Sequence, residues 1–137
     1  ADPLILPKTT WYEDPEQYEV DLDLTQEDVE HLIKAKSALA DVDNMLITTT
    51  SDFDGNNICE FIFGDNTGFS NKITYQAQGT ILEDDINIPF NSSIFKDILN
   101  SNKDMDGARL QLSTRGMMKL TFQSETINSY YYIARNE

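Results

Sequence analysis

Apolar and polar residues alternate in an early segment of the chain, and a helical pattern follows it directly. Val20, Leu22 and Leu24 alternate with acidic residues, which is the two-residue period of a half-buried β-strand. Thr25 then supplies a helix N-cap, with Asp28 in the position that completes a capping box. The residues after the cap recur at helical spacing and line one face: Val29, Leu32, Ile33, Lys36 and Ala40. The pattern predicts a strand that leads directly into a capped helix.

The same order of strand, cap and helix recurs in the second half of the chain. There, Ile86, Ile88 and Phe90 alternate, and either Asn91 or Ser92 provides the cap. The apolar helix face that follows consists of Phe95, Ile98 and Leu99. Each of these positions lies 66 residues after its counterpart, as position 86 does after position 20. The constant spacing predicts that one structural unit is present twice.

An Asp-x-Asp pair follows each predicted helix, in "ADVDN" at 40–44 and "KDMDG" at 103–107. An EF-hand loop needs glycine at its sixth position, and Gly107 comes two places early after Asp104. In "SDFDGNN" at 51–57, Gly55 is early in the same way. Asp, Asn and Gly in such stretches favour turns. We interpret the Asp-x-Asp pairs as helix-to-strand connectors, with a calcium-dependent binding module as the weaker alternative.

Further strand-like runs complete both copies. Phe61 and Phe63 match Leu120 and Phe122, now 59 residues apart, because the first hairpin, around "SDFDGNN", is longer than the second, around "TRGM". Each copy then ends on another strand, "KITYQAQGTI" and "SYYYIAR". The sequence therefore predicts an α+β fold of two tandem β-α-β-β-β units, at about 17–84 and 85–137, with two helices packed on antiparallel sheets. Residues 1–16 are predicted to form an extended connector.

Charge and composition exclude several classes of function. The net charge is -14, from 24 acidic and 10 basic residues, so binding that neutralises many phosphates is not expected. The single cysteine, Cys59, lies in an apolar run and is expected to be a buried thiol in a reducing compartment. With one histidine, a Cys/His metal cluster is excluded, and no P-loop or GxGxxG motif occurs. We expect a cytoplasmic, non-membrane protein that is not an enzyme and holds no metal or cofactor.

Two tandem β-α-β-β-β units, the first helix "LTQEDVEHLIKAKSAL" and the closing pair "GMMKLTFQSETINSYYYIAR" resemble a DNA polymerase sliding clamp. The similarity is to the carboxy-terminal domain of the phage type, with "ADPLILPKTTWYEDPEQ" in the place of the interdomain connector. Protomers of that type carry two such domains, so the resemblance implies a longer protomer. It also implies a homotrimeric ring around duplex DNA that acts as a processivity factor, with DNA polymerase and a clamp loader as partners.

The resemblance implies two sites. Inner helices of a clamp face DNA, which would give this role to Lys34, Lys36, Lys96 and Lys103. Clamps also bind short apolar tails of replication proteins between the connector and the last strands, which would form a pocket from Leu4, Ile5, Leu6, Pro7, Pro89, Tyr131 and Ile133.

Simpler roles stay open for the same residues. The lysines would then belong to solvated helix faces, with Lys34 paired to Glu30 one turn earlier. The connector residues Leu4 to Leu6 would pack on their own domain. The alternative function is an acidic protein-interaction or DNA-mimic module that binds a basic partner through its carboxylates.

Overall fold

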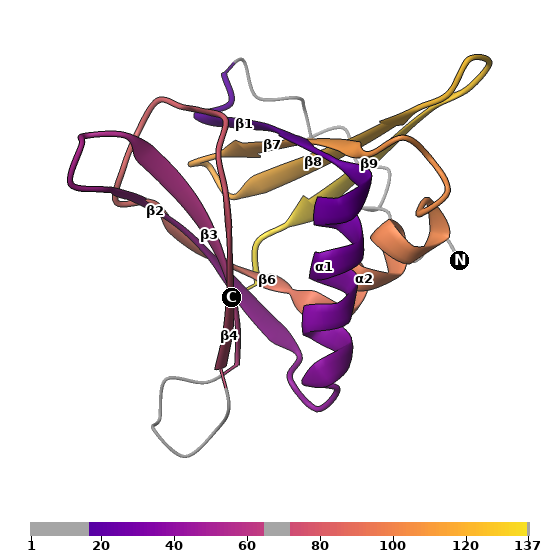
Figure 1. The fold of residues 1–137 in the computed structure, drawn as a ribbon, viewed down its shortest axis with the longest axis horizontal. Coiled ribbons are helices and arrows are strands. Elements are labelled where there is room, and N and C mark those ends of the chain that lie inside the picture. The colour runs from indigo at the N-terminus through magenta and orange to yellow at the C-terminus, as the bar shows by residue number, and fades with distance from the viewer. Residues whose placement is uncertain (1–16, 65–71, 137) are drawn as a thin grey trace.

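The computed structural model describes residues 17–64 and 72–136 (Figure 1). Two helices and nine strands are present in this part of the chain. In chain order they are β1 (Val20–Leu24), α1 (Gln26–Ala38), β2 (Asn44–Ser51), β3 (Asn57–Gly64), β4 (Lys72–Ala77), β5 (Thr80–Ile81), β6 (Asn87–Asn91), α2 (Ser92–Ser101), β7 (Ala108–Ser113), β8 (Met117–Gln123) and β9 (Asn128–Ala134).

The strands form two antiparallel sheets. One has five strands in the order β5-β1-β7-β8-β9, and the other has four in the order β4-β3-β2-β6. The first strand of each copy is exchanged, since β1 pairs with β7 of the second copy and β6 pairs with β2 of the first. The predicted pair of β-α-β-β-β units is therefore confirmed, and neither unit completes its sheet without the other.

The strand register repeats the sequence spacing between the two copies. Leu22 of β1 lies opposite Leu110 of β7, and Ile88 of β6 lies opposite Ile47 of β2. These are counterpart pairs, because Ile88 lies 66 positions after Leu22 and Leu110 lies 63 positions after Ile47. The internal repeat thus extends from the sequence pattern to individual cross-strand contacts.

The run "KITYQAQGTI" is not one strand, contrary to the prediction from its pattern. It divides into β4, which pairs with β3, and β5, which pairs with β1 in the other sheet. At Gly79, between them, an added Cβ would lie 2.7 Å from the backbone oxygen of Asp21. The chain changes sheets where its backbone passes too close to β1 for any side chain.

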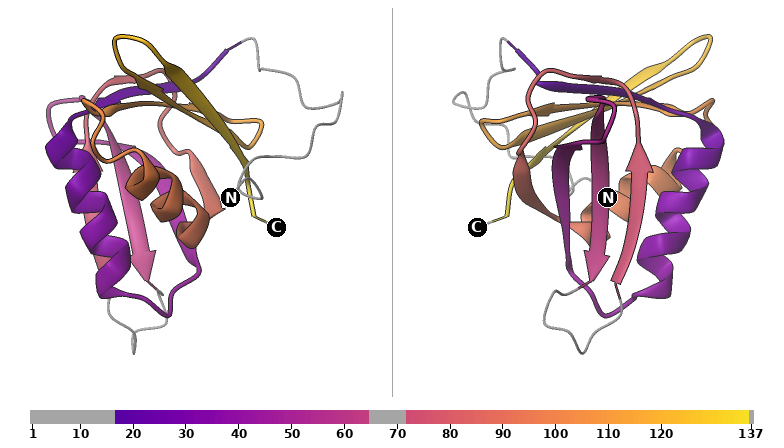
Figure 2. Two further views of the ribbon diagram at one scale, coloured as in Figure 1. Left: turned by 90° about the vertical axis from the view of Figure 1, so that its right-hand side faces the viewer. Right: turned by 60° about the vertical axis from the view of Figure 1, so that its left-hand side comes forward.

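Helices α1 and α2 lie side by side and pack against the inner faces of the sheets (Figure 2). The rings of Phe61 on β3 and Phe95 on α2 stack with centroids 6.0 Å apart. The buried residues of α1 are Val29, Leu32, Ala35 and Lys36. The predicted face was wrong at Ala40, which is exposed beyond the end of the helix. No helix in the described segments is long and apolar enough to span a membrane.

Candidate nucleic-acid interface

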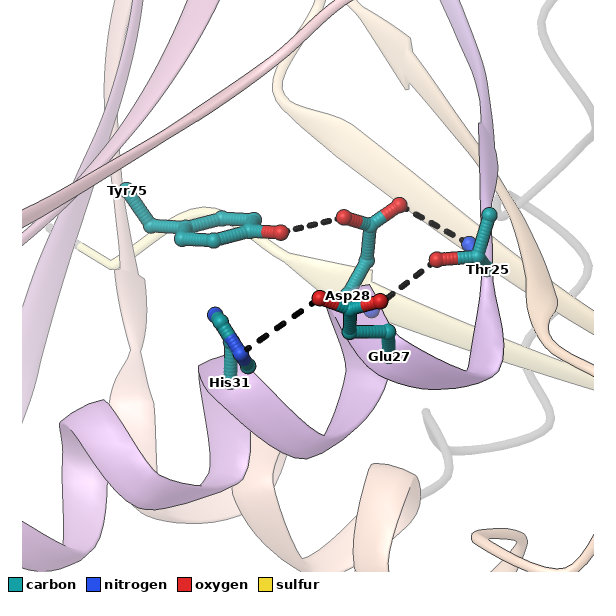
Figure 3. A network of polar contacts seen from close by, with 5 residues as sticks. All are labelled: Thr25, Glu27, Asp28, His31 and Tyr75. Carbon is teal, nitrogen blue, oxygen red and sulfur yellow. Dashed lines mark hydrogen bonds and ion pairs between the residues drawn. The ribbon is translucent and has the colours of Figure 1, made fainter.

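A network of polar contacts fixes the first turn of α1 (Figure 3). The Thr25 hydroxyl oxygen accepts a hydrogen bond from the backbone N–H of Asp28 at 3.0 Å, and the Thr25 N–H donates to the Asp28 carboxylate at 2.9 Å. This is the predicted capping box. The hydroxyl of Tyr75, on edge strand β4, donates to the other oxygen of the same carboxylate. Asp28 therefore joins the start of the helix to the edge of the four-stranded sheet.

The electrostatics of this network follow from burial and hydrogen bonding. Burial raises the pKa of Asp28, but hydrogen bonds from Tyr75 and Thr25 lower it by more, so the net pKa lies below its usual value. Burial and the neighbouring Asp28 carboxylate raise the pKa of Tyr75 to about 12. The ring of His31 meets the ring of Tyr75 edge to face, with centroids 5.6 Å apart. Its Nε2 atom lies 3.9 Å from the carboxylate of Glu27.

The predicted DNA-facing lysines have different environments. Lys34 on α1 is exposed, and Lys96 on α2 is partly exposed. Lys103 is exposed in the turn after α2, and its backbone oxygen accepts a hydrogen bond from the side chain of Gln26 at 3.2 Å. That bond joins the start of α1 to the residues that follow α2.

Lys36 does not belong to this surface, and its prediction is corrected. Its side chain is only 4% exposed. Its ammonium nitrogen donates to the backbone oxygens of Leu39 at 3.3 Å and Ala40 at 3.0 Å. Lys36 therefore satisfies carbonyl groups at the end of α1 while its aliphatic stem packs in the core.

The two helices carry little of the protein's net charge. Their two lysines that are not buried, Lys34 and Lys96, stand against four carboxylates, Glu27, Asp28, Glu30 and Asp97. The accessible surface of the helix pair is therefore acidic, with two more carboxylates than lysines. Phosphate contact on the helix pair would therefore rest on Lys34 and Lys96.

The structure describes only some residues of the predicted peptide pocket. Leu4, Ile5, Leu6 and Pro7 lie outside the described residues. Pro89 is partly buried in edge strand β6, and its backbone oxygen accepts from the N–H of Asn136 at 2.9 Å. Thus the chain after β9 passes beside Pro89.

The two β9 residues of the predicted pocket differ in accessibility. Tyr131 is partly buried, and its hydroxyl accepts from the Asn102 side chain at 3.3 Å. Its ring meets that of Phe122 edge to face at 5.8 Å. Ile133 is 4% exposed and belongs to the core, so its prediction as a pocket residue is corrected. The sequence of an edge strand does not show whether an apolar residue is buried or exposed, because the residues that bury it belong to other elements.

The sequence pattern did not identify a polar depression of about 1030 Å³ on the outward face of the five-stranded sheet. Within it, the Arg109 guanidinium holds the carboxylate of Asp21 through two hydrogen bonds of 2.9 and 2.6 Å. Lys119 lies over the rings of Tyr130 and Tyr132, at 5.1 and 5.5 Å from their centroids. The signal was present in the alternation of β7, β8 and β9, whose polar positions share one face. The depression offers both charge signs and aromatic surface.

Comparison with known proteins identifies the fold. No family model matches the sequence, and no curated protein matches it. Among solved structures, the chain is similar to the beta clamp of Helicobacter pylori in complex with diflunisal, with a TM-score of 0.62 and 16% identity over 92% of this chain. The fold is that of a sliding clamp.

Two further structures of that protein give the same result. The H. pylori beta clamp in complex with carprofen matches with a TM-score of 0.60 and 16% identity over 92% of this chain. The clamp bound to a DNA ligase peptide matches with a TM-score of 0.56 and 14% identity over 96%. This chain spans only 34–35% of the length of these clamp chains.

Proposed function

We propose that this chain is a domain of a DNA polymerase sliding clamp, which tethers the replicative polymerase to duplex DNA by encircling it and catalyses no reaction. The observation that carries the proposal is the sliding-clamp fold, in which the paired helices α1 and α2 carry the accessible side chains of Lys34 and Lys96. A closed ring stays on DNA by topology, so a few transient phosphate contacts suffice. Tight binding would stop the ring from sliding.

The sheet edges support assembly into such a ring. Strands β4 and β9 are equivalent strands of the two copies, and each lies at an edge of its sheet. An unpaired antiparallel edge is a template for another strand. Pairing of β4 in one domain with β9 in the next is a head-to-tail contact, which closes into a ring when the rotation per domain allows it. We propose a phage-type homotrimer in which this chain is the carboxy-terminal domain of each protomer and functions in the cytoplasm of the infected cell.

Partner proteins would bind by short peptides. One of the H. pylori clamp structures is bound to a DNA ligase peptide, which supports this mode of recognition for the fold. We propose that the polymerase and the clamp loader present such peptides to the segment Leu4 to Pro7, beside Pro89 and Tyr131. Ile133 would support this surface from the core without touching the peptide.

The test is retention on DNA of different topology. The native-length protein is loaded by its loader onto closed circular duplex, and half of the sample is then linearised. Retention on circles with loss from linear ends is expected, and protein blocks at both ends should restore retention. Equal retention on circular and linear DNA would reject encirclement and favour the acidic interaction module, which needs no topological link.

A further inference from the structure

The hairpin between β2 and β3 is longer than the shared fold requires. Five residues, 52–56, connect the paired residues Ser51 and Asn57. In the counterpart hairpin of the second copy, three residues, 114–116, connect Ser113 to Met117. Because both hairpins serve equivalent strands, the shorter turn shows what the fold needs. The additional residues of the first hairpin are free to serve another purpose.

An ordered turn presents Phe53 to solvent at the tip of this hairpin. Phe53 is fully exposed, at 109% of its reference area. The side chain of Asp52 accepts hydrogen bonds from the backbone N–H groups of Asp54 and Asn56, both at 2.9 Å. Gly55 adopts a φ of +84°, which favours glycine. The turn is thus built from local hydrogen bonds that do not use the aromatic ring.

A second exposed apolar residue lies in the adjoining loop. Leu82 is 58% exposed. The Asn57 side chain donates to the backbone oxygen of Ile81 at 3.0 Å, and the Ser51 hydroxyl donates to the Asp84 carboxylate at 3.3 Å. These bonds fix the loop beside the hairpin. We name residues 51–57 and 82–85 the acidic corner.

The acidic corner carries charge of one sign only. It contains five carboxylates and no lysine, arginine or histidine, and the carboxylates are Asp52, Asp54, Glu83, Asp84 and Asp85. DNA and anionic membranes are repelled by such a surface. A basic surface is attracted to it, and an apolar pocket there would cover the exposed ring of Phe53.

We propose that the acidic corner docks a basic amphipathic segment of a partner protein, whose apolar side chains pack around Phe53 as the anchor, with Leu82 beside it, and whose lysines or arginines form the rim. Aromatic anchors surrounded by polar residues are typical of binding hot spots. The carboxylates steer the encounter and select a basic rim. Figure 1 shows the β2–β3 hairpin on the side of the molecule away from α1 and α2. Docking there leaves the helix pair uncovered.

The experiment uses a synthetic amphipathic peptide as the probe, with leucines along one helical face and lysines on the other. The protein is titrated with it and followed by amide chemical shifts. Phe53→Ala is the test variant. Ile127→Ala is the matched control, because Ile127 is 59% exposed on the hairpin between β8 and β9. Both side chains are exposed, so neither variant disturbs the core.

We expect shifts centred on the acidic corner and a loss of affinity of about tenfold or more in the Phe53→Ala variant, the size typical of an aromatic anchor. Ile127→Ala should bind within about twofold of the unaltered protein. A scrambled peptide of the same composition should bind more weakly. Equal binding of Phe53→Ala, or of the scrambled peptide, would overturn the proposal. So would a dimer in sedimentation velocity that Phe53→Ala abolishes, since the occupant would then be a second copy. No DNA is involved, so this test is independent of ring closure.

Discussion

Replacing Lys34 and Lys96 by glutamine separates DNA contact from ordinary surface solvation. The two lysines are accessible on adjacent helices, whereas Lys119 lies on the outward face of the five-stranded sheet. Lys119→Gln changes the net charge by the same amount as either helix substitution. It is therefore the charge-matched control, and any difference between the variants reports on position.

The expected magnitude follows from counterion release. Each lysine that neutralises one phosphate contributes about 0.9 to the slope of log affinity against log salt concentration. Two such contacts lower affinity about 20-fold between about 20 mM and about 100 mM salt, and one contact lowers it about fourfold. Lys34→Gln or Lys96→Gln should therefore lose about half of the slope, and the double variant nearly all of it.

The assay is fluorescence anisotropy of a labelled duplex oligonucleotide with the native-length protein at several low salt concentrations. Thermal melts of each variant confirm folding. Lys119→Gln should keep the slope of the unaltered protein. An unchanged slope in the double variant, or an equal loss in Lys119→Gln, would show that the helix lysines do not contact phosphate and would refute the assignment of α1 and α2 to the DNA-facing side.

Three further predictions concern stability. Lys36→Ala should lower the free energy of unfolding by about 1–2 kcal/mol, because two backbone oxygens lose their donor, whereas Lys34→Ala should change it by less than about 0.5 kcal/mol in urea unfolding. Tyr75→Phe should lower it by about 1 kcal/mol at neutral pH, and in a double-mutant cycle the same substitution should cost less in the Asp28→Asn background, which lacks the charged acceptor. The Asp28 contribution is present above its unfolded pKa of about 4 and is lost as pH falls through its lower folded pKa, while the Tyr75 contribution is lost as pH rises from about 10 to about 12. Gly107→Ala should destabilise by about 2 kcal/mol or more, because φ is +89° and a Cβ would lie 2.3 Å from the backbone oxygen at the end of β1; a melting temperature equal to that of the unaltered protein would contradict this.

The sequence predicted the parts of the fold that depend on neighbouring residues. The strand, cap and helix of each copy were identified because Thr25 and Asn91 act on backbone groups within one turn. The Asp-x-Asp stretches form connectors, as turn-forming residues indicated. The repeat spacing is matched by the strand register, since equivalent apolar positions must reach the same core.

Contacts between distant residues could not be predicted in the same way. The change of sheet at Gly79 depends on the nearness of β1, nearly sixty positions earlier, and the residues 72–81 keep one continuous strand pattern. The Tyr75 hydroxyl meets Asp28 across 47 positions. A lysine is expected at the surface by residue type. The burial of Lys36 depends on the backbone oxygens of Leu39 and Ala40, which accept hydrogen bonds from its ammonium group after the helix ends. In each case the determining neighbour belongs to another element or to an irregular segment.

Tyr75 and Tyr131 occupy equivalent positions in the two copies, which relates the edge strands to the helices. Tyr75 of β4 lies opposite Phe61, and Tyr131 of β9 lies opposite Leu120. The hydroxyl of Tyr75 donates to Asp28 on α1, and that of Tyr131 accepts from Asn102 at the end of α2. Both edge strands are therefore hydrogen-bonded to the helix of their own copy. In a ring closed through β4 and β9, the orientation of each edge would fix that of the helix facing DNA. A chain with so few accessible helix lysines depends on that alignment more than one with a strongly basic inner surface.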